Sequence, residues 1–380
     1  MPRRALVFAI LLCLGLPAAE AWADHAKVLP ANVWRVRTMA VNGWADQKYA
    51  LDGSGDTTPL FSNELINYQD SEILPKRYYY GQLENDARMV QWRTDFLVDY
   101  GITDSFTFQL WIPYYWQKKV ELGKWSHDLS YKPAAPEFDA QLGQVAIAQA
   151  NMLYPADPSY AGVGDIMAGF KHQLFKNELL RLAYALGVRF PTGHVDDPDV
   201  LDDISLGDGQ WDAGIWLFAD YQPWPWFFVN AHFKYEYQFA GTYAKPSRDS
   251  LCSMLGEHPP NRGGEYTRKP GDYLHYELEP QLQLFEGLLS PSVLLAFQQT
   301  LPDDYDGWTQ PGGDPHRERN TYSRMAWVAP KLYLYHLASG GQKAALPFEL
   351  SLEYRIPVWG ENAVAAQVLL LEAKVYARFW

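Results

Sequence analysis

The sequence contains little cysteine. Only two cysteines occur, and Cys13 lies inside an N-terminal apolar run, so Cys252 is the one that remains in the rest of the chain. A single cysteine cannot build a disulfide framework, and no paired C-x-x-C motif is present. Small secreted folds that are held together by disulfide bonds are therefore excluded.

Long apolar stretches are also missing. After residue 23, no apolar run approaches the roughly eighteen residues that a membrane-spanning helix needs. No long segment shows a convincing helical period either. The sequence therefore excludes a helical membrane protein.

Basic charge is scarce as well. The chain has 32 Lys and Arg residues against 45 Asp and Glu residues, which gives a formal net charge of −13. A nucleic-acid partner would require a basic stripe, so none is predicted. Most of the excess acid lies in segments that we predict to be loops, which is typical of an exposed outer surface.

Catalytic and metal-binding motifs are not found. The sequence has no H-E-x-x-H, G-x-S-x-G or haem-attachment motif. Its histidines are scattered, and no spacing brings one of them to a particular serine. We therefore predict neither an enzyme nor a bound cofactor or metal. The histidines fall on predicted strands (His172, His232, His275, His336) and in predicted loops (His127, His194, His258, His316).

The N-terminus carries an export signal. Arg3 and Arg4 precede an apolar run from Ala5 to Leu16, and Ala21-Trp22-Ala23 offers a small-residue cleavage site. This pattern predicts a signal peptide over residues 1–23 and an outer-membrane β-barrel domain over residues 24–380. An uncleaved anchor is the alternative, but about a dozen apolar residues are too few to span a bilayer as a helix.

Aromatic residues are abundant, at 15% of the chain, with 25 Tyr and 15 Trp. This composition suits a barrel whose lipid face is apolar at every second residue and whose rims carry aromatic girdles. Alternation with a period of two residues recurs along the chain. From Leu180 to Phe190, for example, large apolar side chains alternate with small or charged ones.

The fold class predicted from this alternation is all-β, a single-chain transmembrane antiparallel β-barrel of about 12 strands. The segments are near the length of about ten residues that a tilted strand needs to cross the hydrocarbon. They are Trp34–Val41, Val90–Tyr100, Phe106–Trp116, Val163–Leu174, Leu180–Phe190, Trp211–Tyr221, Phe227–Phe239, Tyr273–Phe285, Pro291–Thr300, Tyr322–Leu337, Phe348–Val358 and Val364–Phe379.

The connections alternate between short and long, as in bacterial outer-membrane barrels with short periplasmic turns and long extracellular loops. An even number of strands places both termini in the periplasm. Whether the lumen is open, or plugged by the loop of residues 43–87, is left undecided. Short links are predicted at residues 101–105, 175–179, 222–226, 286–290 and 338–346, long ones at 43–87, 117–162, 191–210, 240–272 and 301–321, and a short outer loop near Gly360.

The chain ends in aromatic residues on an amphipathic strand, which resembles the signal that the barrel-assembly machinery reads. Leu371, Val375 and Phe379 share one phase of that strand, whereas Trp380 falls in the other. One extra residue at the end would explain this departure from the usual pattern.

Three stretches carry a resemblance to a known family. They are GVGDIMAGFKHQL at 162–174, LRLAYALGVRFPTG at 180–193 and LGDGQWDAGIWLFADY at 206–221. Their sequences resemble the meta-pathway of phenol degradation family of outer-membrane barrels, which includes the exporter of functional amyloid. The resemblance implies a single-chain outer-membrane transport barrel. Residues 24–33 hold no heptads, so the exporter's specialised role is not expected.

The shared motifs favour structural roles. Gly162 and Gly164 permit a tight entry into a strand at Asp165, and no helix follows to support a dinucleotide-binding loop. The turn at Pro191-Thr192-Gly193 opens an acidic loop, which is either solvated at the lipopolysaccharide surface or holds Ca²⁺. The loop carboxylates are Asp196, Asp197, Asp199, Asp202, Asp203 and Asp208, with Asp212 just beyond.

The inward phase of the strands predicts the solute path, because ionisable groups in a lumen decide which solutes pass. Their mixed signs predict salt bridges between strands, which serve either a conducting lumen or the bracing of a plugged one. The predicted lumen-lining residues are Arg93, Asp95, Lys171, Arg181, Arg189, Asp212, His232, Lys234, Glu236, Glu277, Glu279, Glu353 and Arg355.

We therefore expect a porin-like outer-membrane channel for passive passage of small organic solutes, and aromatic or hydrophobic solutes are candidates. Rim aromatics would supply either stacking surfaces or an ordinary girdle. A barrel that exports or docks a protein partner is the alternative, and a soluble secreted β-sandwich is a remote one. Expected partners are outer-membrane lipid, lipopolysaccharide, the assembly machinery and the solute. The rim aromatics are Tyr78, Tyr79, Tyr80, Trp111, Tyr114, Tyr115, Trp116 and Trp125.

Overall fold

The computed structural model describes residues 25–60, 65–68, 78–83, 88–121, 125–126, 159–197, 203–245, 264–307, 318, 320–339 and 342–378. The predicted signal peptide, Cys252 and the terminal Phe379 and Trp380 lie outside these ranges. No helix among the described residues is long and apolar enough to cross a membrane.

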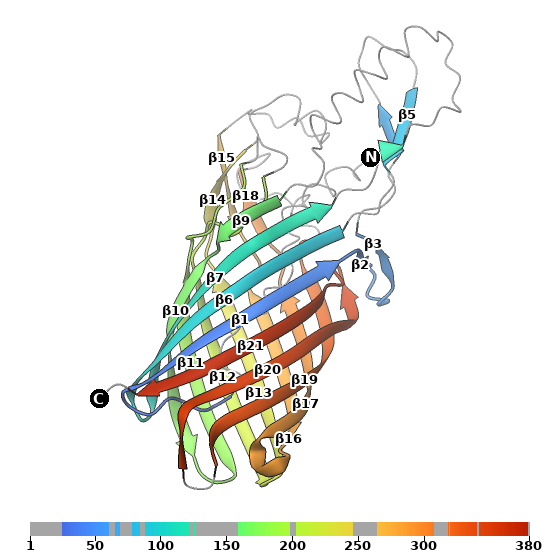
Figure 1. The fold of residues 1–380 in the computed structure, drawn as a ribbon. Helices are drawn as coiled ribbons and strands as arrows, with labels where there is room; N and C mark the ends of the chain where they lie inside the picture. The colour runs from blue at the N-terminus through green and yellow to red at the C-terminus, as the bar shows by residue number, and fades with distance from the viewer. Residues whose placement is uncertain are drawn as a thin grey trace.

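One closed antiparallel sheet forms the body of the molecule, and all its strands tilt in the same sense (Figure 1). Each strand pairs with its neighbour along the chain, and β1 pairs with β21 to close the ring of 12 strands. The predicted barrel is confirmed. Its strands are β1 (Val33–Ala45), β6 (Arg88–Thr103), β7 (Phe106–Glu121), β10 (Ile166–Lys176), β11 (Leu180–Phe190), β12 (Asp212–Trp224), β13 (Phe227–Gln238), β16 (Tyr273–Leu282), β17 (Leu289–Thr300), β19 (Ser323–Ser339), β20 (Gln342–Glu361) and β21 (Gln367–Arg378).

Several strands differ in length from the prediction. β19 continues to Ser339 and β20 already begins at Gln342, so the link between them is much shorter than the predicted residues 338–346. β6 and β7 also extend beyond their predicted ends. The physical reason is that the hydrogen-bond ladder continues past the apolar belt, where alternation of side chains no longer marks the strand.

The strand predicted from Val163 to Leu174 is broken near its start. β9 (Ser159–Val163) pairs with the outer part of β7, and β10 begins only at Ile166. Between them, Gly164 donates its N–H to the Pro113 carbonyl (2.9 Å). A Cβ on Gly164 would lie 2.7 Å from the Tyr115 ring, so this close approach requires glycine.

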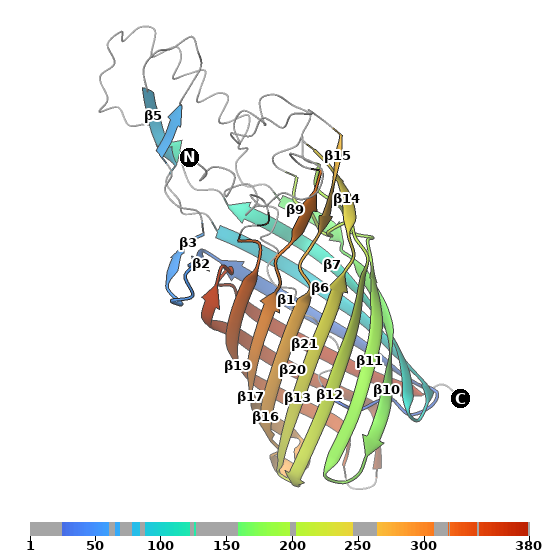
Figure 2. The ribbon, with the colours of Figure 1, turned by 180° about the vertical axis from the view of Figure 1, so that it is seen from behind.

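The two ends of the barrel differ. Val33 on β1 pairs with Arg378 on β21, so both described ends of the chain lie with the tight links, at what we call the short-turn end. The opposite, long-loop end carries small sheets that continue beyond the barrel (Figure 2). They are β2 (Gln47–Tyr49) with β3 (Thr57–Pro59), β4 (Leu65–Tyr68) with β5 (Tyr78–Leu83) and β8 (Trp125–Ser126), and β14 (Gly241–Ala244) with β15 (Glu265–Lys269) and β18 (Asp304–Asp306).

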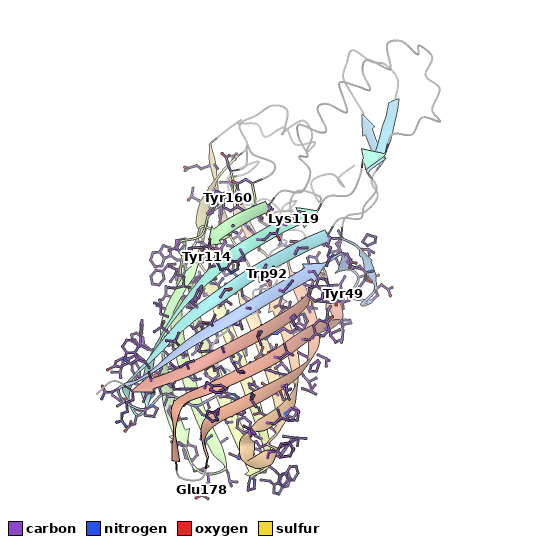
Figure 3. All side chains as sticks on the ribbon, viewed as in Figure 1. Tyr49, Trp92, Tyr114, Lys119, Tyr160 and Glu178 are labelled. Atoms are coloured by element: carbon purple, nitrogen blue, oxygen red, sulfur yellow. The ribbon has the colours of Figure 1, made fainter. Side chains whose placement is uncertain are left out.

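The barrel carries apolar side chains on its outside and charged side chains on its inside, which is the reverse of a soluble domain. Trp92 and Leu186 are 53% and 50% exposed on the outer wall, whereas Arg93 and Asp95 are 0% exposed on the inner one. In Figure 3, side chains project from the whole height of the barrel wall, from the turn at Glu178 at the short-turn end to the long-loop end. An apolar outer face and a charged inner face are what a barrel in lipid requires, and they confirm the predicted phases.

Candidate functional site: the barrel lumen

Residues 25–32, the N-terminal segment, enter the lumen from the short-turn end. The Ala26 N–H donates to Asp220 Oδ1 on β12 (2.7 Å), and the Leu29 N–H donates to Thr107 Oγ1 on β7 (2.9 Å). Ala26 is fully buried. Side chains of the wall thus satisfy backbone groups that belong to no strand ladder.

His25 reaches the far wall. Its ring lies 5.6 Å from Phe228 on β13 and 6.1 Å from Tyr333 on β19, and its Nδ1 lies 2.5 Å from Asn230 Nδ2. Lys171 on β10 donates to the His25 carbonyl. β13 stands opposite β1 in the ring, so the segment extends from one side of the lumen to the other. The loop considered as a plug, residues 43–87, lies partly outside the described residues.

An ionic cluster joins three neighbouring strands nearer the long-loop end. Arg189 on β11 lies 2.8 Å from Glu236 on β13 and 3.6 Å from Asp212 on β12. Lys234 lies 2.6 Å from the same Glu236. The antiparallel register places these side chains on one inward face, as the alternation predicted.

A second cluster joins β16, β19 and β20 at mid-height. Lys331 Nζ lies 3.1 Å from Glu353 and 3.8 Å from Glu279. Arg355 lies 2.5 Å from Glu353 and 3.5 Å from Glu277. Buried charges need partners of opposite sign, and each member of this cluster has at least one.

A third cluster near the short-turn end was not in the predicted set. Lys374 on β21 lies 2.9 Å from Glu349 and 3.1 Å from Glu372, and Glu372 lies 2.6 Å from Arg37 on β1. The sequence held the signal for them, because they occupy the same inward phase as the predicted residues on their neighbours. The charged lumen residues that the prediction missed are Arg37, Glu349, Glu372 and Lys374 in this cluster, the nearby pair Arg35 and Asp99, and Lys331 in the second cluster.

Cations in the lumen also lie over aromatic rings. The Lys171 ammonium is 3.8 Å from the centroid of Phe218. An aromatic face attracts a cation, and it does so more strongly where water is excluded. The lumen therefore presents charge and aromatic surface together. Further pairs are Arg93 over Trp111 and Tyr115, Lys234 over Trp216 and Tyr273, and Lys331 over Tyr333.

All the residues predicted to line the lumen lie in the described ranges. Their role in passing a solute remains a prediction. Arg93, Asp95, Lys171, Asp212, Lys234, Glu236, Glu279 and Glu353 are buried, whereas Arg181, Arg189, His232, Glu277 and Arg355 are partly buried.

The predicted rim aromatics divide. Trp111 is buried and lies beside the Arg93 guanidinium, so its assignment to the outer rim is wrong. Tyr115 also lies beside Arg93, to whose guanidinium it is hydrogen-bonded (3.4 Å). Trp116 is exposed and donates to Thr94 Oγ1 (2.8 Å), as expected of a girdle residue. The side chains of Tyr78, Tyr79, Tyr80 and Trp125 lie outside the described residues.

The three sequence stretches that carry the family resemblance meet at the long-loop end. Asp165 accepts the N–H of Gly193 (2.8 Å) and of Asp208 (3.2 Å). A Cβ on Gly207 would lie 2.4 Å from Asp165 Oδ1. We call these residues the rim junction. Burial raises the pKa of Asp165. Burial also raises the pKa of Asp208, to about 6; the charge of Asp165 adds to this effect, whereas the charge of Arg189 opposes it.

Among the described residues, the carboxylates of the acidic loop do not gather into a group with the spacing of metal ligands, and calcium binding stays a prediction. Asp203 lies 2.7 Å from His194 and accepts the Asp197 N–H (2.8 Å), so it is engaged within the loop. Among the described carboxylates, histidines and cysteines, one group has the spacing of metal ligands, and it lies elsewhere. Asp199 and Asp202 fall outside the described residues.

Comparisons with known proteins give structural neighbours. No family model and no curated protein matches the sequence. The COG4313 outer membrane channel from Pseudomonas putida F1 superposes with a TM-score of 0.58 at 13% identity, covering 94% of this chain and 100% of that one. A TodX monoaromatic hydrocarbon channel mutant (TM-score 0.37, 10% identity, 92% and 91% covered) and a Pseudomonas aeruginosa FadL homologue (0.36, 10%, 91% and 90%) are also similar. The first likeness shows that the chain has the fold of an outer-membrane channel.

Proposed function

We propose that the protein is an outer-membrane channel for small organic solutes that combine an aromatic or hydrophobic part with a polar group. The observation that carries this proposal is the inverted barrel, whose apolar outer wall suits lipid and whose lumen pairs buried charges with aromatic rings. A rigid aromatic solute finds ring faces there, and its polar group finds ionic partners. Membership of the meta-pathway of phenol degradation family remains part of the proposal.

The membrane orientation follows from the same proposal. The short-turn end would face the periplasm, and the long-loop end would face the lipopolysaccharide surface. Export through a cleaved signal peptide and insertion by the barrel-assembly machinery would precede this state. The structural likeness to an outer membrane channel supports a barrel that passes solutes across that membrane.

The N-terminal segment is the proposed constriction. It spans the lumen from β1 to Phe228 and Tyr333, and the wall residue Asp220 holds its backbone. Removing residues 25–30 is therefore expected to raise the single-channel conductance in planar bilayers several-fold. The matched control is Asp104→Ala, which removes only the contact to the Ala31 N–H at the exposed mouth (2.9 Å) and should leave conductance unchanged.

Solute choice is tested in liposomes that contain the refolded protein. Benzoate and the sugar arabinose serve as probes of similar size, and benzoate is expected to enter faster in both the intact and the shortened protein. Absence of conductance and of uptake in both proteins would contradict a channel. Faster entry of arabinose would contradict the aromatic solute class.

A further inference from the structure

A group of potential metal ligands lies in the lumen, apart from the N-terminal segment. His232 on β13, and His275 and Glu277 on β16, place three donor atoms within 4.8 Å of one another. The register sets this arrangement, because His232 pairs directly with Glu277 across the two strands. His275 and Glu277 are two residues apart and thus share the inward face.

The distances are close to those of a metal centre. His275 Nε2 lies 2.8 Å from Glu277 Oε1, and His232 Nδ1 lies 3.4 Å from Glu277 Oε2. Ligand atoms around a tetrahedral Zn²⁺ stand roughly 3.4 Å apart. Small side-chain rotations would bring all three into that range, with the metal replacing the proton between His275 and Glu277.

A supporting hydrogen bond selects the ligating nitrogen of His275. Tyr273 donates its hydroxyl hydrogen to Gln298 Oε1 (2.9 Å), so its oxygen can accept from His275 Nδ1 at 3.3 Å. Metal-binding histidines commonly donate the N–H of their second ring nitrogen in this way. This arrangement leaves His275 Nε2 for the ion. Tyr273 is a positioning residue in this account.

The imidazole of His232 is nearly buried and has one ring nitrogen without a hydrogen-bond partner among the described residues. The side chain is 9% exposed, and the nitrogen without a partner is Nε2. The Phe218 ring stacks on the imidazole at a centroid distance of 4.8 Å and an interplanar angle of 2°. The stacking orients the imidazole plane, and its buried Nε2 without a partner is the kind of group that a bound ion or water would satisfy.

The surrounding charges allow a cation. Arg355 lies 3.5 Å from Glu277 but is bonded more closely to Glu353 (2.5 Å). Lys234, which pairs with His275 across the strands, is bonded to Glu236 (2.6 Å). Both nearby cations thus have carboxylate partners of their own, and Glu277 can exchange Arg355 for a metal ion.

We propose that His232, His275 and Glu277 form a lumenal site for a divalent transition-metal ion, with Zn²⁺ as its reference ion. Two imidazole nitrogens and one carboxylate suit Zn²⁺ rather than Ca²⁺ or Mg²⁺, which prefer oxygen. Three protein ligands leave one coordination position that faces the lumen. An ion bound there narrows the path at mid-height, so Zn²⁺ is also expected to reduce conductance.

The test uses the full-length protein without a polyhistidine tag, stripped with EDTA in detergent and titrated calorimetrically with Zn²⁺. One ion per chain is expected to bind. Glu277→Gln and His232→Ala should each weaken binding about 100-fold or more, and Tyr273→Phe about tenfold, within the range for supporting residues. His336→Ala, an exposed histidine on β19, is the control and should bind as the intact protein does.

Folding of each variant is checked by heat-modifiable migration in gels. Glu277→Gln preserves the side-chain size and keeps one acceptor oxygen, so it decides the outcome if a histidine variant does not fold. Absence of saturable Zn²⁺ binding overturns the site, and so does a bound ion whose affinity none of the three variants changes. If Tyr273→Phe lowers stability but not Zn²⁺ affinity, its positioning role is rejected. Binding is measured without transport, so the result is independent of the proposed channel function.

Discussion

At the scale of single residues, this lumen depends on pairing of buried charges. Arg35 on β1 lies 2.7 Å from Asp99 on β6, and Asp99 also accepts from Gln109 on β7 (2.9 Å). Asp99 is 0% exposed. Such a pair adds little net stability compared with apolar residues, but breaking it by removing one partner is costly.

Arg35→Met is therefore expected to lower the free energy of unfolding by about 3 kcal/mol, because Asp99 keeps its charge and loses the guanidinium. The double variant Arg35→Met with Asp99→Asn should recover most of that loss. Urea unfolding in lipid vesicles measures both. A double variant as unstable as the single one would mean that the charge on Asp99 is not the cause.

Asp208 makes the rim junction sensitive to pH. Burial is the main reason that its pKa in the folded protein rises from 3.8 to about 6. The folded junction thus binds a proton more tightly than the unfolded loop does, so its stability falls as the pH rises through about 4 to 6. Hydrogen-exchange protection factors over residues 191–211, which are corrected for the intrinsic pH dependence of amide exchange, should be higher at pH 5 than at pH 7.5. Asp208→Asn should reduce this difference, and an unchanged pH dependence in that variant would assign it to another group, such as Asp165.

At the scale of elements, the rim junction connects the start of β10, the end of β11 and the start of β12. Asp165 lies directly before β10, and its carboxylate fills the place where Gly207 has no side chain. The nearest atoms to a Cβ at Gly207 all belong to that carboxylate. The glycine is thus required by a contact between two loops that are distant in sequence.

Gly207→Ala is expected to destabilise the junction and to speed proteolysis of the loop between β11 and β12 by roughly tenfold, an effect of about 1.4 kcal/mol. In an Asp165→Ala background, the same change should have little further effect. This double-mutant cycle isolates the contact. Equal acceleration in both backgrounds would show that the glycine acts through its backbone conformation instead.

At the scale of the whole molecule, the apolar outer wall determines where the protein is stable. Leu295 lies near the middle of β17 and is 45% exposed, whereas Leu288, which is 47% exposed, precedes that strand at the short-turn end. The two leucines are equally exposed, but they lie at different depths of a barrel that spans a bilayer. Depth should therefore set the cost of placing a charge on each.

Leu295→Arg should destabilise the barrel by about 2–4 kcal/mol in lipid vesicles, and Leu288→Arg by about 1 kcal/mol or less. Equilibrium urea unfolding in vesicles gives both values. Equal costs at the two positions would contradict the assigned depth, and negligible costs at both would contradict an outer wall in lipid.

Alternation predicted the barrel well because lipid and lumen impose opposite demands on successive residues. Arg93 and Asp95 are predicted to face inward because the apolar Trp92 and Phe96 share the opposite phase, and the burial of both charged residues confirms it. Alternation was a poorer guide to strand ends, as at β20, because the ladder outlasts the apolar belt. Trp111 shares the inward phase of Thr107 and Gln109, so the period itself places it inward, and its assignment to the rim followed its residue type instead.

The sequence by itself determined the strands, their phases and the alternation of short and long links, because these depend on a period that can be read along one chain. Only the tertiary structure decided what fills the lumen. The contact of His25 with Asn230, the convergence of Asp165 on Gly207 and the meeting of His232 with Glu277 all join residues distant in sequence. Closure of the barrel brings them together, and no local pattern records which strands will face one another.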